Sequence, residues 1–359
     1  MKVSKRGYRI AVAGASSLLG RELLNVLEEH RFPFSRLVTF TDDQDELELP
    51  IVDLREGSKT SLPDEKVSAA ELDFAFIASS PREISSFLGP AQASDQGQPA
   101  CFVIDLRAAA PGEEAAEPLS PLPGKVLRVP FLDRCFPAED KDEGGENRVY
   151  ISARPATIVI SSLLLRLAAR FPLKSAVANI FSPVSEIGSR GIEELQKQTV
   201  NLLSFQKIPR QIFGAQLAFN LLSRPGGTGG SELLGLENHL RKQIKDYLQG
   251  GVPLPALRLF QVPVFYSLAV SLFLETSQPV APEKAGEALQ GGRVQVRRRS
   301  QDSPSPVEVA GSDKILVDSV AADPDHPTGL WIWAVADNLR LAAVNAVEVA
   351  ESLCHRIAM

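Results

Sequence analysis

The residues with the clearest chemical potential in this sequence lie in a glycine-containing turn near the N-terminus. The turn reads GASSLLG, follows the apolar run 9–13 and precedes the amphipathic segment RELLNVLEEHRF. Backbone N–H groups at such a strand–turn–helix junction, together with the helix N-terminus, can hold the pyrophosphate of a dinucleotide. The candidate phosphate-binding residues are Gly14, Ser16, Ser17, Leu18, Leu19 and Gly20.

Ser17 stands where the usual dinucleotide pattern has its middle glycine, the point at which the backbone approaches the phosphates most closely. Its side chain would crowd the phosphates, although serine is small and can donate a hydrogen bond. The turn therefore predicts a dinucleotide site, and the alternative is a strand-to-helix turn that binds nothing.

Polar residues also follow the next two apolar runs, at the edge where a doubly wound sheet presents its ligand crevice. Asp42 and Asp43 come after the run 36–40. An acidic residue there suits the ribose hydroxyls of NAD and repels the extra phosphate of NADP, so NAD is favoured over NADP. The alternative is that the two aspartates begin a solvated loop. The last three residues of the run 73–80, Ala78, Ser79 and Ser80, are further candidates for contact with the cofactor.

The elements that must position these residues follow from the apolar pattern. Strands are predicted at 9–13, 36–40, 73–80 and 100–106. Strands that alternate with helices form crossover units around a parallel sheet, so the first third is predicted to be a Rossmann-type, doubly wound α/β domain. Later in the chain, strands are predicted at 175–184, 256–265 and 267–276, with helices at 158–170, 189–204, 231–248 and 341–358. This mixture predicts a second, α+β domain with a largely antiparallel sheet.

Composition limits the classes of function. The chain has 359 residues, a net charge of −6 and 44% hydrophobic residues, which suits two globular domains and gives no support for nucleic-acid or membrane binding. No apolar run is long enough to span a bilayer, and the N-terminus is better explained by a strand than by a signal peptide, so a cytoplasmic location is expected. Cys101, Cys135 and Cys354 lie far apart, have no metal-ligand spacing and have no histidine partner suggested by position. No metal site is predicted.

Several segments resemble the aspartate-semialdehyde dehydrogenase family, in the correct order along nearly the whole chain. These segments are the N-terminal GASSLLGRELLNVLEEHRFP, VSEIGSRGIEELQKQT at 184–199, QLAFNLL at 216–222, VPVF at 262–265 and GLWIWAVADNLRLAAVNAVEVAESL at 329–353. The resemblance implies an NAD(P)-binding domain formed by residues 1–135 plus 340–359 and a dimerisation domain at 136–339. It also places Asn338 near the nicotinamide and implies a homodimer.

The catalytic positions depart from that family. Its nucleophilic cysteine falls at Thr157 (or at Ala156 if the alignment slips by one residue), and its catalytic histidine falls at Leu268. Its active-site glutamine becomes Ser182, and a glycine of its serine–glycine segment becomes Glu186. A thioester mechanism requires a thiolate and a base, and a missing nucleophile typically removes several orders of magnitude from turnover.

The sequence therefore predicts a homologue that lacks the parent activity, similar to the Usg-like paralogues that retain the fold and lose the cysteine. It would form a homodimer or associate with a catalytically active family member. Its NAD site would either be retained or be lost. The alternative is an active NAD(P)-dependent oxidoreductase of amino-acid biosynthesis that transfers hydride to an aldehyde or oxo group without a covalent thioester.

Overall fold

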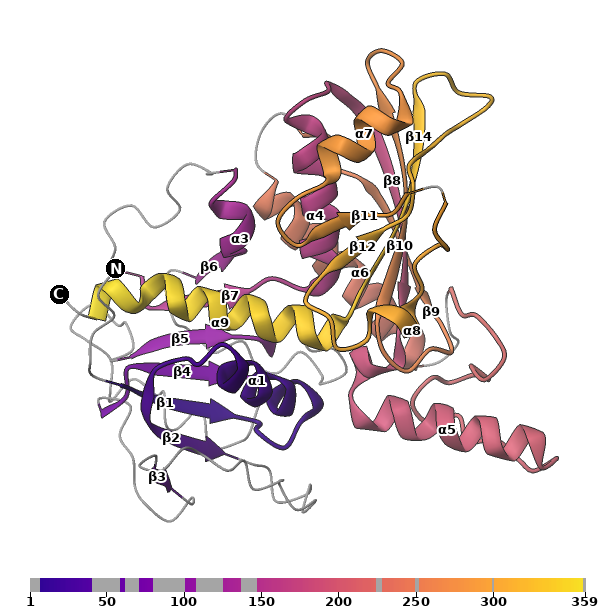
Figure 1. Cartoon of the computed structure of the whole chain (residues 1–359). Coiled ribbons are helices and arrows are strands. Elements are labelled where there is room, and N and C mark those ends of the chain that lie inside the picture. The colour runs from indigo at the N-terminus through magenta and orange to yellow at the C-terminus, as the bar shows by residue number, and fades with distance from the viewer. Residues whose placement is uncertain are drawn as a thin grey trace. The chain divides into compact units, whose positions relative to one another are not determined.

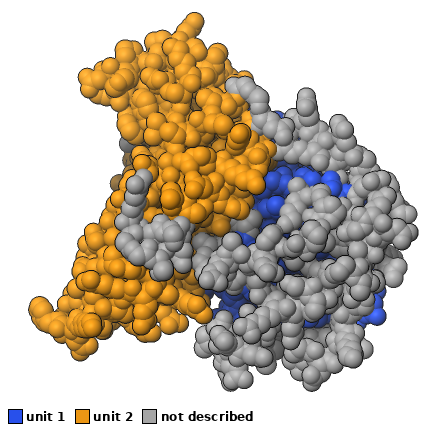
Figure 2. Space-filling view, turned by 180° about the vertical axis from the view of Figure 1, so that it is seen from behind, with its two compact units in different colours: residues 1–153, 342–359 blue, residues 154–341 orange. Residues whose placement is uncertain are grey.

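The computed structural model describes residues 7–40, 59–61, 71–79, 101–107, 125–136, 147–223, 228–248, 252–298 and 300–357. The chain forms two compact units, residues 1–153 with 342–359 and residues 154–341, which Figure 2 shows in two colours. No helix among the described residues is long and apolar enough to cross a membrane.

The first unit is built on a seven-stranded sheet in which every neighbouring pair is parallel. Its strands are β1 (Tyr8–Ala13), β2 (Phe34–Phe40), β3 (Lys59–Ser61), β4 (Phe74–Ile77), β5 (Phe102–Asp105), β6 (Lys125–Arg128) and β7 (Val149–Ser152). The order is β3-β2-β1-β4-β5-β7-β6, so the direction of winding reverses between β1 and β4. The predicted doubly wound α/β fold is confirmed, and this reversal is where such sheets place their ligand crevice.

Among the described residues, three helices belong wholly or partly to this unit: α1 (Leu18–Glu29), the short α3 (Pro130–Asp133) and α9 (Asn338–Ile357). Leu23, Val26 and Leu27 of α1 recur at helical spacing and are buried. The part of α9 from Ala342 onward is tied to this unit, because Asn345 Nδ2 donates to the Arg128 carbonyl at 3.0 Å. Strand β7 pairs with both β5 and β6, so the unit extends to Ala153.

The second unit contains a mixed sheet of order β11-β12-β14-β10-β8-β9, with β13 paired to β14. Its strands are β8 (Leu173–Ser182), β9 (Ala256–Gln261), β10 (Leu268–Thr276), β11 (Val294–Val296), β12 (Ile315–Val317), β13 (Ala321–Ala322) and β14 (Gly329–Ala336). The long strands β8, β10 and β14 pair antiparallel, whereas β8–β9 and β11–β12 are parallel. Strand β9 ends at Gln261, four residues before the predicted end.

The helices of the second unit are α4 (Pro155–Ala168), η4 (Val184–Ile187), α5 (Ser189–Leu203), α6 (Thr228–Tyr247), α7 (Pro282–Leu289) and α8 (Pro306–Val309). Figure 1 shows α4 on one face of the sheet, where it contacts β8, β10 and β14. Val270, Leu272 and Leu274 of β10 are fully buried on alternate positions of the strand. The core of the unit therefore lies between α4 and this face of the sheet.

Candidate functional site

Gly14 and Gly20 give the N-terminal turn its shape. Gly14 has φ +74°, and a Cβ atom added to it would lie 2.0 Å from Ser79 Oγ. A Cβ atom added to Gly20 would lie 2.0 Å from the Gly14 carbonyl oxygen. Both positions therefore require glycine, one for a left-handed turn against the end of β4 and one for close approach of α1 to β1.

The Ser17 side chain is bonded within the turn itself. Ser17 is the N-cap of α1, and its Oγ accepts the Gly20 N–H at 3.0 Å and donates to the Gly14 carbonyl at 2.7 Å. The N–H groups of Leu18 and Leu19 have no intrahelical partner because they lie in the first turn of a helix. The turn thus leaves two N–H donors in the first turn of α1, while the Gly20 N–H is bonded to the Ser17 side chain.

The other predicted cofactor contacts are only partly covered by the structure. Ala78 is buried and Ser79 lies against Gly14, so the residues that follow β1 and β4 are in contact. Asp42 and Ser80 lie outside the described residues. Their roles stay predictions.

Thr157, at the position predicted for the nucleophile, is fully buried in the first turn of α4. Its hydroxyl donates to Gln243 Oε1 at 3.0 Å, and the same oxygen accepts the Arg154 N–H at 3.0 Å. Gln243 Nε2 lies 3.2 Å from His239 Nε2. The Thr157 proton is therefore held by an amide oxygen, which cannot act as a general base.

Gln243 links His239 to Thr157. Desolvation of the ring, followed by the charges of Arg154 and Lys242, lowers the pKa of His239 below its usual range. The imidazole is then neutral at pH 7 and can accept from the Gln243 amide through Nε2. Sequence analysis missed Gln243 and His239, because no resemblance was identified in helix 231–248 and the contact to Thr157 spans 86 residues.

Arg154, the N-cap of α4, and Glu186, which stands at a glycine of the family's segment, form a buried ion pair. Their Nη1 and Oε2 atoms are 3.7 Å apart, and the two residues are 7% and 8% exposed. Burial lowers the pKa of Arg154 to about 10, although the Glu186 charge acts in the opposite direction. Burial also raises the pKa of Glu186, against the effects of Arg154 and of a hydrogen bond to Asn338. Taking two charges out of water is costly, so each residue depends on the other.

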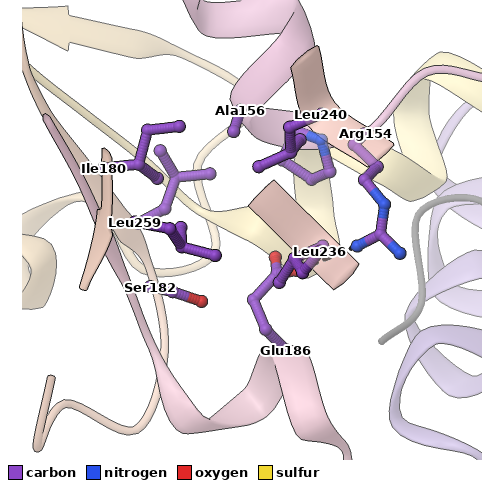
Figure 3. Close-up of a pocket in the computed structure, with 10 residues that line it drawn as sticks. Arg154, Ala156, Ile180, Ser182, Glu186, Leu236, Leu240 and Leu259 are labelled. Carbon is purple, nitrogen blue, oxygen red and sulfur yellow. Dashed lines mark ion pairs between the residues drawn. The ribbon is translucent and has the colours of Figure 1, made fainter. Parts of the chain in front are cut away.

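Leu268, at the position predicted for the catalytic histidine, is 2% exposed and lines a small pocket with the ion pair. Figure 3 shows Leu236 and Leu240 of α6 facing Ile180 and Leu259 of the sheet. The space open to a water-sized sphere is ≈ 10 Å³. This is about the volume that one water molecule needs.

Asn338, predicted to lie near the nicotinamide, is 2% exposed and is bonded within the second unit. Its Oδ1 accepts the Ser267 N–H at 3.0 Å, and its Nδ2 donates to Ser185 Oγ at 3.1 Å. These bonds fix the loop before β10. Contact with a nicotinamide stays a prediction from the resemblance.

The three cysteines, all of them described, belong to the first unit, whereas Thr157 belongs to the second. Cys101 is 1% exposed, and burial raises its pKa to about 12, so it is a thiol at neutral pH. Burial also raises the pKa of Cys354. Cys135 is exposed and belongs to the first unit. No group of three or more histidine, cysteine, aspartate or glutamate residues in the described part of the chain is placed to hold a metal ion.

Comparisons with known proteins find similarity to semialdehyde dehydrogenases and to USG-1 protein homologs. Residues 164–341 match the family model described as semialdehyde dehydrogenase, dimerisation domain. Aspartate-semialdehyde dehydrogenase of Aquifex aeolicus is 28% identical over 97% of this chain and 98% of its own. A USG-1 protein homolog of Azotobacter vinelandii is 26% identical over 96% of this chain and 97% of its own.

Solved structures show the same fold. Aspartate semialdehyde dehydrogenase II from Vibrio cholerae has a TM-score of 0.78 at 24% identity and covers 98% of this chain and 99% of its own. The enzyme from Candida albicans, solved with NADP, has a TM-score of 0.59 at 14% identity and covers 97% of this chain and 98% of its own. Residues 164–341 thus match the dimerisation domain of semialdehyde dehydrogenases, and over nearly its whole length the chain is similar to aspartate-semialdehyde dehydrogenase and to a USG-1 protein homolog.

Proposed function

We propose that this protein is an aspartate-semialdehyde dehydrogenase homologue without the parent activity, which keeps the fold, an association through its second unit and a residual NAD site. The observation that carries the proposal is the Thr157 hydroxyl donating to the amide oxygen of Gln243. A hydroxyl in that arrangement has no base to remove its proton, and no thiol is present at its position.

The chemistry of the parent reaction makes this absence decisive. Oxidation of an aldehyde through a thioester requires a nucleophile that adds to the carbonyl and a base that accepts its proton. Thr157 is fully buried, and Leu268 cannot accept a proton. The two positions therefore supply neither of the required groups.

The surroundings of Thr157 support the same proposal. A polar substrate needs polar partners, yet the pocket beside Thr157 is lined mainly by leucine and other apolar side chains. Its charged residues, Arg154 and Glu186, are paired with each other. We infer that this volume serves the packing of the second unit.

The proposed cofactor is NAD, bound weakly. The residues assigned to it are those predicted from the sequence, with Gly14 to Gly20 at the pyrophosphate, Asp42 at the ribose and Asn338 at the nicotinamide. Asp42 would disfavour the 2′-phosphate of NADP. The proposed partner is a second copy of this chain, and a catalytically active family member is the other candidate.

Phosphate-dependent reduction of NAD and of NADP with aspartate semialdehyde tests the proposal directly. The full chain is expected to give no turnover above the rate without protein, under conditions in which the Aquifex aeolicus relative is active. Clear turnover by the full chain would refute the proposal, because it would show that the missing cysteine was never required.

A further inference from the structure

We propose that Ser17 sets the nucleotide affinity of this chain, by placing its own side-chain oxygen where a dinucleotide phosphate would accept hydrogen bonds. The inference rests on the proposed function only in taking the GASSLLG turn as the nucleotide site. It assigns the weakening of that site to one residue.

The three glycines of a dinucleotide turn have separate physical roles. The first permits the tight turn, the second lets a phosphate approach the backbone, and the third lets the helix pack closely on the strand. In this chain the first and third roles are intact, because a Cβ atom at Gly14 or Gly20 would lie 2.0 Å from another atom. The atoms that a Cβ would meet belong to the protein itself. The fold therefore requires both glycines whether or not a nucleotide binds.

Ser17 lies at the middle glycine of the family segment that this turn resembles, and we assign to that position the role of admitting the phosphate. The residue has φ −66° and ψ 160°, an extended conformation that serine adopts without strain. Nothing in the local backbone therefore selects glycine here. The presence of serine is the change expected when the need to admit a phosphate is relaxed.

The hydrogen bonds of Ser17 show how it would oppose a phosphate. Its Oγ accepts the Gly20 N–H, and its own N–H is bonded to the Gly14 carbonyl at 3.0 Å. A phosphate oxygen that uses the Gly20 donor must displace the Ser17 hydroxyl, which then also loses its bond to the Gly14 carbonyl. Without that displacement, the Leu18 and Leu19 N–H groups are the first-turn donors left for a ligand.

Replacement of Ser17 by glycine is a clean test, because glycine is itself a favourable N-cap and costs little there. Ser305 provides a matched control. It is the N-cap of α8, its side chain accepts the Glu308 N–H, and it lies in the second unit. Ser305→Gly thus removes the same kind of cap away from the turn.

Isothermal titration calorimetry of the full chain with NAD, at ligand concentrations up to several millimolar, measures the effect. Ser17→Gly is expected to bind NAD at least about 10-fold more tightly than the wild type, while Ser305→Gly binds like the wild type. Equal or weaker binding by Ser17→Gly, including no binding by either protein, would overturn the inference, as would micromolar binding by the wild type. Thermal unfolding verifies that both variants are folded. The turnover assay of the wild type is a separate measurement, so failure of the proposed function and failure of this inference are distinguishable.

Discussion

The surroundings of a single residue decide whether its role can be identified from the sequence. Sequence reasoning identified Thr157 and Leu268 as departures from a catalytic pattern, and the structure places both in the buried core of the second unit. The sequence also identified Gly14 and Gly20, since a turn with special backbone geometry leaves a glycine signal. It could not identify Gln243, because a hydrogen bond to a residue 86 positions away leaves no local pattern.

Thr157→Cys is expected not to restore the parent activity. The thiol would lie against the Gln243 amide and would have no base, since Leu268 stands in the place of the histidine. Electrostatic and proton-transfer groups each typically contribute a factor of ~10²–10⁴, so one restored group leaves the rate far below that of an intact site. Phosphate-dependent NAD and NADP reduction measures the outcome, with Thr157→Cys/Leu268→His as the comparison. Turnover by the single variant near that of an active relative would contradict this prediction.

Ser267→Gly is expected to stabilise the protein by about 1 kcal/mol. Ser267 has φ +71°, a region that favours glycine, and its buried hydroxyl finds no hydrogen-bond partner among the described residues. Glycine removes the backbone strain and the buried unbonded hydroxyl, and these gains are partly offset because glycine gives the unfolded chain more conformational entropy. Denaturant unfolding measures the change, and Ser267→Ala separates the two effects because it removes only the hydroxyl. A Ser267→Gly variant less stable than Ser267→Ala would show that the backbone is not strained there.

At the scale of elements, helix α5 and the buried strands β4 and β5 were predicted, and strands β7 and β14 were not. Helix α5 was predicted at 189–204 and spans Ser189–Leu203. Strands β7 and β14 were missed as strands: β7 has four residues, and the β14 sequence entered the argument only through its resemblance to a family segment. Strand β7 owes its existence to its pairing with β5 and β6, earlier in the chain, so its four residues carry a weak signal of their own.

Glu194 and Gln198 give the motif IEELQKQT a structural role. Glu194 accepts the N–H groups of residues 211, 212 and 213 at 2.8 to 3.1 Å. One turn later, Gln198 accepts the N–H groups of Leu217 and Ala218. These two side chains therefore tie the segment after α5 back onto the helix.

Glu194→Ala is expected to destabilise this segment by about 2–3 kcal/mol, because it leaves three backbone donors without their acceptor. Hydrogen exchange at residues 211–213 should become much faster, and denaturant unfolding gives the global change. Glu194→Gln is the matched variant, since it keeps one acceptor oxygen and should lose less stability than Glu194→Ala. Unchanged exchange in Glu194→Ala would mean that the segment is held by other contacts.

A clip of Asp323, His326 and Trp331 joins β14 to the loop before it. Asp323 Oδ2 accepts the Trp331 Nε1–H at 2.8 Å, and Oδ1 lies 2.9 Å from His326 Nδ1. The bonds from Trp331 and then His326 lower the pKa of Asp323 to about 2. The hydrogen bond and charge of Asp323 raise the pKa of His326.

The clip is therefore expected to be strongest between the unfolded pKa values of the two groups, ~3.9 for aspartate and ~6.5 for histidine. The Asp323 contribution is lost as the pH falls toward 2, and the His326 contribution is lost as the pH rises through its raised folded value. An NMR titration of the His326 ring measures how far its pKa is raised. Asp323→Asn should return the His326 pKa toward its usual value, and an unchanged pKa in that variant would rule out the clip.

At the scale of the whole molecule, the sheet of the second unit has one face covered by its own chain and one that is less covered. The covered face packs on α4. On the other face, Val177, Phe273 and Trp331 are directly paired across β8, β10 and β14. Val177 and Trp331 are 41% and 40% exposed, an unusual state for paired apolar residues of adjacent strands. The sequence predicted apolar residues on both faces of β10, and it could not show which face α4 would cover.

We therefore expect the protein to be a dimer that buries this second face, through an interface of more than roughly 2,000 Å² if the association is obligate. Light scattering at micromolar concentration should give twice the chain mass of 38.8 kDa. Val177→Lys should shift the mass toward the monomer, because it places a charge in the middle of the apolar row. Leu234→Lys, which changes an exposed leucine on α6, is the control and should leave the dimer intact. A monomeric wild type would show that this face needs no partner, and a dimer unaffected by Val177→Lys would place the interface elsewhere.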